Sequence, residues 1–214
     1  MIPSERKFYI FRFCRWWCWL FMKLYNRYEP IGADVIPAEG ACIVVANHVS
    51  FMDPPALGCG PMHRAMRFMA RSTLYKEGFA DWLFTNLATI PLSRDKGDLT
   101  AMRKALLVLK EGGCLGLFPE GTRTPDGTLQ PAKSGIGFLI AKAGVPVIPA
   151  YIDGTFAALS RQSRFIKPVK IRVKYGRPIT PAEIAALGQG RDCYEKAAKL
   201  VTEKIAALRD ELRK

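Results

Sequence analysis

Residues 114 to 123 are Cys114-Leu115-Gly116-Leu117-Phe118-Pro119-Glu120-Gly121-Thr122-Arg123, in which a short apolar run passes directly into a polar turn. A second stretch is built in the same way, because the apolar run Cys42-Ile43-Val44-Val45-Ala46 continues as Asn47-His48-Val49-Ser50-Phe51-Met52-Asp53. Short, uninterrupted apolar runs of this kind are typical of buried strands. Each predicted strand is therefore followed by a polar motif, and we expect the two motifs to form one site.

The rest of the chain alternates short apolar runs with longer helical patterns. Further strands are predicted over residues 67–70, 145–150 and 169–175, and helices from Pro54 and over residues 72–87, 98–111, 134–143 and 191–214. Pro146 and Pro149 argue against a central, fully hydrogen-bonded position for the 145–150 strand, since proline has no N–H to donate. The alternation predicts an α/β fold, with one domain over residues 31–214 that has a central mixed sheet flanked by helices.

The composition of the 214-residue chain narrows the class of protein. Hydrophobic residues make up 49% of the sequence, which excludes global disorder. The formal net charge of +13 predicts an anionic partner: a phosphate-bearing substrate, an acidic membrane surface, an acidic carrier protein or nucleic acid. The six cysteines are scattered without a Cys-x-x-Cys pair, and the chain has two histidines, so we expect reduced cysteines, a cytosolic-side protein and no metal site.

The N-terminal segment, residues 1–30, has the pattern of an amphipathic helix. Its longest apolar run, Trp16 to Met22, would span about 10 Å as a helix, whereas the hydrocarbon core of a bilayer is roughly 30 Å thick. Basic residues gather on one side of this helix and apolar residues on the other: Arg12, Arg15, Lys23 and Arg27 against Ile10, Phe13, Trp17, Phe21 and Leu24. The pattern predicts a helix that lies in the membrane interface without crossing the bilayer, and whose removal leaves a folded α/β domain.

Two alternatives exist for this segment. The helix can instead dock on the protein's own core. A cleaved signal peptide is disfavoured, because Arg12 and Arg15 interrupt the apolar stretch and no small-residue cleavage site follows.

The first motif offers a base and a carboxylate. Near neutral pH the imidazole of His48 can take a proton from a hydroxyl group, and Asp53 can fix its tautomer and stabilise the imidazolium that forms. The hydroxyl of an acceptor substrate would then be the nucleophile, and no covalent serine is required. The alternative is a solvated turn histidine. His63 has no carboxylate nearby in the sequence and is interpreted as non-catalytic.

The second motif suits a phosphate group. Gly121 lets the backbone approach a ligand closely, and Arg123 can bind phosphate oxygens in bidentate fashion. Phosphate would repel Glu120, so we expect this residue to orient a substrate hydroxyl or to hold the loop through an arginine. Three further cations can serve the same anion site, and the alternative for each is a solvated surface cation: Arg71, Arg94 and Lys133. The alternative is a plain surface turn.

Together the two motifs resemble those of the glycerophospholipid acyltransferases, especially the 1-acylglycerol-3-phosphate O-acyltransferases. The resemblance rests on Asn47-His48-x-Ser50-x-x-Asp53 and on Phe118 to Arg123, and extends to the blocks Ile90 to Arg94 and Val145 to Pro149. It covers roughly residues 40 to 155, with the blocks in the same order. It implies an α/β acyltransferase fold for residues 31–214 and transfer of an acyl group from a coenzyme A or acyl-carrier-protein thioester to a lysophospholipid hydroxyl.

The resemblance also implies roles for individual residues. His48 matches the family's catalytic base and Asp53 the partner of that base. The acyl-acceptor block is matched by Glu120, Gly121, Thr122 and Arg123. Arg71 stands where the family often has a lysine, Ser50 belongs to the first block, and Arg94 follows Ser93, where an acidic residue is common.

The expected protein is therefore an enzyme of phospholipid biosynthesis that turns lysophosphatidic acid into phosphatidic acid. We expect it at the cytoplasmic face of the cell membrane, peripheral or monotopic, with no cofactor besides the acyl donor and no nucleic-acid partner. One alternative is an acyltransferase for another lyso-lipid or glycerol 3-phosphate. Another is a non-catalytic basic module for acidic membranes or nucleic acid, although such a module has no use for His48 and Asp53.

Overall fold

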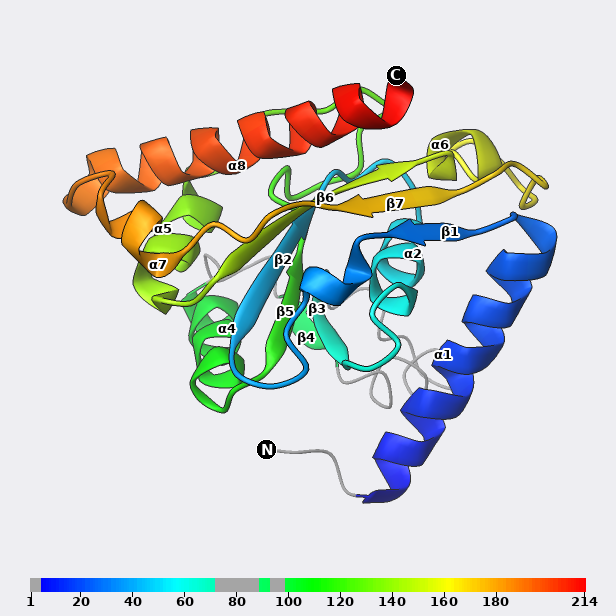
Figure 1. Cartoon of the computed structure of the whole chain (residues 1–214), viewed down its shortest axis with the longest axis horizontal. Helices are drawn as coiled ribbons and strands as arrows, with labels where there is room; N and C mark the ends of the chain where they lie inside the picture. The colour runs from blue at the N-terminus through cyan, green and yellow to red at the C-terminus, as the bar shows by residue number, and fades with distance from the viewer. Residues whose placement is uncertain (1–4, 72–88, 93–98) are drawn as a thin grey trace.

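One mixed β-sheet forms the centre of the protein, as seen in a computed structural model that describes residues 5–71, 89–92 and 99–214 (Figure 1). Within these ranges the sheet has seven strands: β1 (Glu29–Ile31), β2 (Cys42–Ala46), β3 (Met66–Arg71), β4 (Ile90–Leu92), β5 (Cys114–Leu117), β6 (Val147–Asp153) and β7 (Arg172–Tyr175). Their order is β1-β7-β6-β2-β5-β3-β4, and every neighbouring pair is parallel except β6 and β7. The predicted mixed sheet is thereby confirmed.

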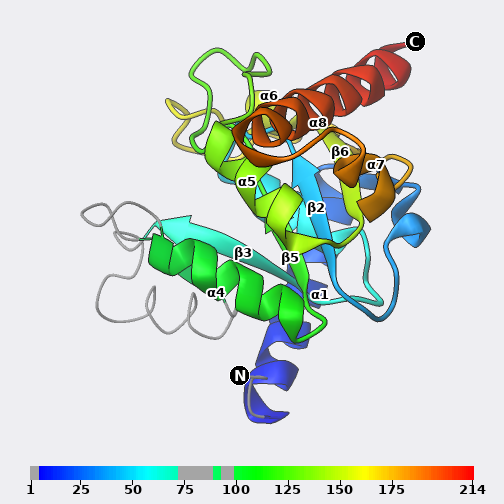
Figure 2. The same ribbon diagram turned by 90° about the vertical axis from the view of Figure 1, so that its left-hand side faces the viewer.

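Helices cover both faces of the sheet (Figure 2). One face is covered by α4 (Leu99–Lys110), α5 (Ser134–Ala143), α7 (Pro181–Ala185) and α8 (Gly190–Arg213), and the other by α1 (Glu5–Tyr25) and α2 (Asp53–Cys59). Two short elements, η1 (Ala33–Val35) and α6 (Thr155–Ala158), complete the described helices. An apolar core therefore lies on each side of the sheet.

Strand β2 shows why the sequence folds in this way. Its side chains alternate between the two cores: Ile43 and Val45 pack toward α4, α5 and α8, whereas Cys42, Val44 and Ala46 pack toward α1 and α2. A strand that is covered on both faces reads as an unbroken apolar run instead of an alternating one. Polar residues begin only where this run ends, at the carboxyl edge of the sheet.

Most of the elements predicted from the sequence are present. The predicted strands at residues 42–46, 67–70 and 169–175 correspond to β2, β3 and β7, and the helices from Pro54 and over 98–111, 134–143 and 191–214 to α2, α4, α5 and α8. The helix predicted over residues 72–87 lies outside the described residues. Four cysteines are buried as small apolar side chains: Cys42, Cys59, Cys114 and Cys193.

The expectation that the 145–150 strand avoids a central position is wrong. β6 lies between β7 and β2 and pairs with both. The carbonyl of Pro149 accepts a hydrogen bond from the N–H of Gly176 (2.8 Å). The nitrogen of Pro149 points to the same side, away from β2, so its lack of a hydrogen removes no hydrogen bond between β6 and β2. Gly176 follows the last residue of β7, and the proline is tolerated because the gap falls at the end of that ladder.

Helix α1 is attached to the rest of the protein through one side. Met22 is 1% exposed and packs in the core shared with α2, and Arg15 donates hydrogen bonds to the backbone carbonyls of Met62 (2.7 Å) and Arg64 (2.5 Å). Beyond the helix, Tyr28 is fully buried. Removing the segment would take out these two core residues, so we expect the shortened chain to be less stable than the full one, and its ability to fold stays a prediction.

The opposite side of α1 is apolar and exposed. Large side chains lie on it, each at least 41% exposed: Tyr9, Phe13, Trp16, Trp17, Phe21, Leu24 and Tyr25. The predicted basic stripe needs correction, because Arg15 faces inward and Arg27 lies beyond the last residue of α1. No helix within residues 5–71, 89–92 and 99–214 has both the length and the apolar character to cross a membrane.

Candidate active site

The candidate active site lies where β2 ends and α2 begins. His48 is the second residue after β2, and Asp53 is the first residue of α2. The imidazole Nδ1 of His48 and the carboxylate Oδ2 of Asp53 are joined by a 2.8 Å hydrogen bond. The Asp53 side chain is fully buried, whereas 19% of the His48 side chain is exposed. The pair can therefore present the imidazole to a substrate while the carboxylate stays out of water.

The backbone holds the Asp53 carboxylate in place for this contact. The same oxygen, Oδ2, accepts hydrogen bonds from the N–H groups of Val49 (2.6 Å) and Ser50 (2.7 Å). Because this acceptor faces Nδ1 of His48, the imidazole carries its proton on Nδ1 and leaves a lone pair on Nε2. Nε2 is thus the atom that can take a proton from a hydroxyl group.

An aromatic side chain fixes the plane of the His48 ring. Phe118 follows β5 and stacks on the imidazole, with ring centres 4.2 Å apart and an angle of 18° between the planes. The ring of Phe118 is itself stacked with the ring of Phe68, in β3, with ring centres 6.0 Å apart. The first residue of the second motif therefore sets the orientation of the base in the first motif.

The second motif and the residue that follows it, Thr124, also hold the main chain of His48. The N–H of His48 donates to Oε1 of Glu120 (3.0 Å), and the carbonyl of His48 accepts from the N–H of Thr124 (3.0 Å). These contacts are possible because β2 and β5 are parallel neighbours, with Val45 opposite Leu117, so their carboxyl ends meet at one edge of the sheet. The structure thus brings the two sequence motifs into one site.

Burial changes the protonation of Glu120. The side chain is 3% exposed, and this loss of solvent raises its pKa to about 7, with a further contribution from the charge of Asp53. Hydrogen bonds from the backbone N–H groups of His48 and Gln130 act in the opposite direction. The sequence did not reveal that Glu120 holds the main chain of His48, since this contact depends on the register of two strands.

Two basic side chains border the site. The guanidinium of Arg123 lies over the ring of Phe51, 3.4 Å from its centre. Lys133 lies across Gly121, because a methyl group at Gly121 would come within 3.0–3.1 Å of Nζ, Cδ and Cε of Lys133. Gly121 also has a left-handed φ of 69°, so both its backbone and its surroundings favour glycine. The two cations supply positive charge beside the first motif.

The other predicted residues have different positions. Ser50 is buried, and its hydroxyl donates to the carbonyl of Leu159 (2.7 Å), so it supports the loop after β2. Thr122 is exposed at the surface of the second motif. Arg71 is the last residue of β3, and Arg94 lies outside the described residues.

Asn47 is a supporting residue whose role the sequence did not predict. Its buried side-chain amide donates to the carbonyl of Ile152 (3.0 Å) and accepts from the N–H of the same residue (2.8 Å). The amide therefore pairs with β6 as a backbone peptide would, just beyond the last pair of β2 with β6. A polar residue directly after an apolar strand was the only sequence signal for this contact.

Helix α2, which carries Asp53, is anchored by two buried tyrosines. The hydroxyl of Tyr28 donates to the carbonyl of Ala56 (2.6 Å), and that of Tyr175 donates to the carbonyl of Leu57 (2.7 Å). Burial raises the pKa of both phenols above the usual range, so both remain hydrogen-bond donors. Two side chains from outside α2 therefore anchor the middle of the short helix that begins with Asp53.

Comparison with known proteins identifies the family. A model of the family described as Acyltransferase matches residues 27–153, a range that contains both motifs and the strands β2, β5 and β6 that position them. The chain belongs to the acyltransferase family. The resemblance expected from the two motifs is thereby confirmed.

Individual relatives carry more specific names. The 1-acyl-sn-glycerol-3-phosphate acyltransferase of Bacillus subtilis is 25% identical over 166 residues, which cover 78% of this chain and 77% of that protein. The chloroplastic 1-acyl-sn-glycerol-3-phosphate acyltransferase of Brassica napus is 28% identical over 154 residues, which cover 71% of this chain and 44% of the relative. The chain spans about half the length of the chloroplastic relatives that it matches.

A solved structure shares the fold. The crystal structure of the 1-acyl-sn-glycerophosphate acyltransferase PlsC from Thermotoga maritima matches with a TM-score of 0.78 and 28% sequence identity. The match covers 98% of this chain and 84% of the other. The predicted acyltransferase fold is therefore confirmed.

Proposed function

We propose that this family member converts lysophosphatidic acid into phosphatidic acid, by moving a fatty acyl group from a thioester to the sn-2 hydroxyl of 1-acyl-sn-glycerol 3-phosphate. The observation that carries the proposal is the 2.8 Å hydrogen bond between His48 and the buried Asp53, beside the cations Arg123 and Lys133. The relatives in Bacillus subtilis and Brassica napus are named for this acceptor, which supports the same assignment here.

In the first step His48 acts as a general base. Its Nε2 takes the proton of the sn-2 hydroxyl while the hydroxyl oxygen attacks the thioester carbonyl, and a carbon–oxygen bond forms. The buried carboxylate of Asp53 stabilises the resulting imidazolium. A positioned base of this kind typically contributes about 10²–10⁴-fold to the rate.

In the second step the tetrahedral intermediate breaks down. The carbon–sulfur bond breaks, the sulfur leaves as a thiol with the proton that His48 held, and the ester product remains. His48 returns to its neutral form with Nδ1 still bonded to Asp53. The acyl group passes directly from donor to acceptor, without an acyl-enzyme.

The acceptor phosphate needs positive charge near His48. Arg123 can bind phosphate oxygens in bidentate fashion, and the ammonium group of Lys133 lies over Gly121 of the same motif. Arg71, at the end of β3, is a third candidate. Glu120 repels phosphate less than a solvated carboxylate does, because burial raises its pKa to about 7.

The acyl donor is proposed to be acyl-coenzyme A or acyl-carrier protein, both of which are anionic and suit a net charge of +13. We place the enzyme at the cytoplasmic face of the cell membrane as a peripheral or monotopic protein, held by the exposed apolar side of α1. The mechanism uses the two substrates and the side chains named above, and no nucleic-acid partner is proposed.

Thioester consumption with a panel of acceptors tests the proposal. Coenzyme A and acyl-carrier-protein thioesters would each be combined with lysophosphatidic acid, other lyso-lipids and glycerol 3-phosphate. We expect the highest kcat/KM with lysophosphatidic acid. Preference for glycerol 3-phosphate or a neutral lyso-lipid would assign another acceptor, and no consumption with any acceptor would support a non-catalytic basic module.

A further inference from the structure

The loop between α6 and β7 carries an unusual surface. Phe165 is 81% exposed, more than any other large apolar side chain in the described part of the chain. Three exposed basic residues surround it in the sequence: Arg161, Arg164 and Lys167. The chain has no acidic residue between Gly154 and Ala182. The loop therefore places an exposed aromatic ring among basic residues that no acidic residue of the same segment neutralises.

Hydrogen bonds fix this loop to the C-terminal end of α1. The hydroxyl of Tyr25 donates to the carbonyl of Ile166 (3.0 Å), next to Phe165. The fully buried amide of Asn26 donates to the carbonyls of Lys167 (2.9 Å) and Val169 (3.0 Å). The position of Phe165 is therefore coupled to that of α1 and does not depend on the loop alone.

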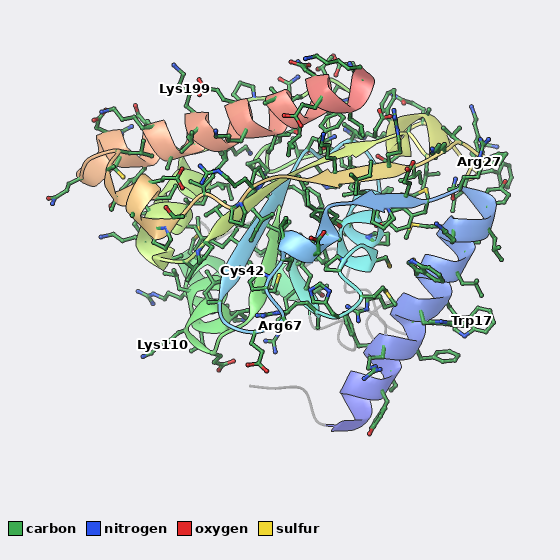
Figure 3. The ribbon with its side chains drawn as sticks, in the orientation of Figure 1. Trp17, Arg27, Cys42, Arg67, Lys110 and Lys199 are labelled. Carbon is green, nitrogen blue, oxygen red and sulfur yellow. The ribbon has the colours of Figure 1, made fainter. Side chains whose placement is uncertain are left out.

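The loop continues the exposed apolar side of α1. Figure 1 shows the loop after α6 beside the C-terminal end of α1, at one margin of the molecule, and Figure 3 shows Trp17 and Arg27 at this same margin. Along α1, Trp17 is 51% and Leu24 is 74% exposed. Aromatic and aliphatic side chains next to basic ones are the composition that binds the interface of an anionic membrane.

We infer that residues 160–168 are a second membrane contact, in which Phe165 enters the headgroup region of an anionic bilayer while Arg161, Arg164 and Lys167 bind its phosphates. The occupant is a lipid surface because the loop adjoins the apolar side of α1 and has the opposite charge to acidic lipids. The inference rests on the proposed membrane attachment through α1, but not on the proposed acyl transfer.

The loop also connects this surface to the candidate active site. Leu159 directly precedes residues 160–168, and its carbonyl accepts a hydrogen bond from the hydroxyl of Ser50 (2.7 Å). Ser50 lies two residues after His48. The N–H of Lys167 donates to the carbonyl of Ala158 (2.8 Å), which closes the base of the loop. Docking of the loop therefore sets the orientation of His48 relative to the bilayer that contains the lipid acceptor.

The test compares two variants of the full chain with equal changes in charge. The loop variant combines Phe165→Ser with Arg161→Gln, Arg164→Gln and Lys167→Gln. The control variant makes the same kinds of change on α4, where Leu107 is 52% exposed and the basic residues are also exposed: Leu107→Ser, Arg103→Gln, Lys104→Gln and Lys110→Gln. Lys110 lies at the opposite side of the molecule from Trp17 (Figure 3).

Co-sedimentation with vesicles of phosphatidylglycerol and phosphatidylcholine measures the binding constants. Each basic residue near an anionic surface contributes about fivefold, so the loop variant should bind at least about tenfold more weakly than wild type, and the control variant close to wild type. At saturating lipid, brominated lipids should still quench the tryptophans of α1 in the loop variant.

Several results would overturn the inference. Wild-type binding by the loop variant, or an equal loss in the control variant, would mean that the loop makes no specific contact. Weaker binding to acyl-carrier protein with unchanged binding to vesicles would identify a protein-docking surface. The acceptor assay in detergent does not depend on vesicle binding. It therefore tests the proposed acyl transfer separately from the proposed membrane contact.

Discussion

The carboxyl group of Glu120 accepts a 3.0 Å hydrogen bond from the backbone N–H of His48, so an acid of one motif holds the main chain of the base in the other. The acid is almost fully buried, and burial raises its pKa to about 7. A group that titrates near neutral pH is therefore coupled directly to the candidate catalytic residue, and its protonation can be tested separately from catalysis.

Glu120→Gln should stabilise the protein at neutral pH relative to wild type. In wild type the stability associated with protonated Glu120 is fully present below pH 4.5 and is lost as the pH rises through about 7, because the pKa is higher in the folded state. Glutamine does not ionise and keeps an oxygen that can accept from His48. The difference in unfolding free energy between variant and wild type should grow by up to about 3 kcal/mol between pH 4.5 and pH 8.

Urea denaturation at several pH values measures this difference. The decisive result is whether the difference in unfolding free energy grows or shrinks as the pH rises. A difference that stays constant, or that shrinks as the pH rises, would contradict the raised pKa of Glu120.

His48→Ala and Asp53→Asn should each lower kcat by about 10²–10⁴-fold, because both remove general-base catalysis. Circular dichroism should show that the fold persists. His63→Ala is a matched control, since His63 Nε2 lies 2.9 Å from the carbonyl of Ile36 and this side chain has no part in the proposed mechanism. Normal turnover by folded His48→Ala would exclude the mechanism.

Arg123→Ala and Lys133→Ala should each raise the KM for a phosphate-bearing acceptor more than the KM for the acyl donor. The reason is that the lost contact is to the acceptor phosphate, whereas the thioester carbonyl is unaffected. Steady-state kinetics with each substrate varied in turn provides the measurement. Lys110→Ala, an exposed cation on α4, is the control for loss of charge. A change in the donor KM alone would assign these cations to the other substrate.

The sequence was sufficient where burial on both faces imposes a pattern. Cys42 to Ala46 and Cys114 to Leu117 are apolar because helices cover both sides of the sheet, and this pattern predicted both strands. Polar residues directly after these strands then predicted a shared site. The sequence failed at Pro149, because the cost of a missing N–H depends on which neighbour it faces, and that neighbour lies far along the chain.

Contacts that depend on tertiary packing were also beyond the sequence. Periodicity showed that α1 is amphipathic, but aromatic residues occur on both its sides, so the pattern could not decide which side meets the protein. The burial of Met22 and the inward position of Arg15 decide it in the structure. The contact of Glu120 with His48 was hidden for a similar reason, since no spacing within one motif encodes the register between β2 and β5.

Gly137→Ala should destabilise the protein, whereas Gly135→Ala should not. A methyl group at Gly137 would lie 1.9 Å from the carbonyl oxygen of Tyr194 and 3.2 Å from the N of Ala198, both in the backbone of α8. Helix α8 would have to move, at a cost of about 1–3 kcal/mol. At Gly135 the nearest atom is Cε of Met102 at 3.5 Å, and alanine favours the helix by up to about 1 kcal/mol. Chemical denaturation measures the unfolding free energy of both variants. Equal values for the two variants would contradict the close packing of α5 on α8.

Substitutions on the exposed side of α1 should affect membrane binding, and substitutions on its buried side should affect folding. Trp17→Ser with Leu24→Ser removes exposed apolar surface, so binding to anionic vesicles should fall by roughly tenfold or more while the unfolding free energy changes little. Met22→Ala should do the reverse, because Met22 is 1% exposed in the core, and should lower the unfolding free energy by about 2–5 kcal/mol. Vesicle sedimentation and urea denaturation of the same variants provide the two measurements.

Salt dependence tests how α1 is held. Added salt should weaken vesicle binding only in part, because it screens the basic residues but not the burial of Trp16 and Trp17 in the interface. Complete release by moderate salt would mean that charge alone attaches the protein. Protease cleavage of the N-terminus from the far side of a sealed vesicle would mean that the segment spans the bilayer, which would refute the interfacial position proposed for α1.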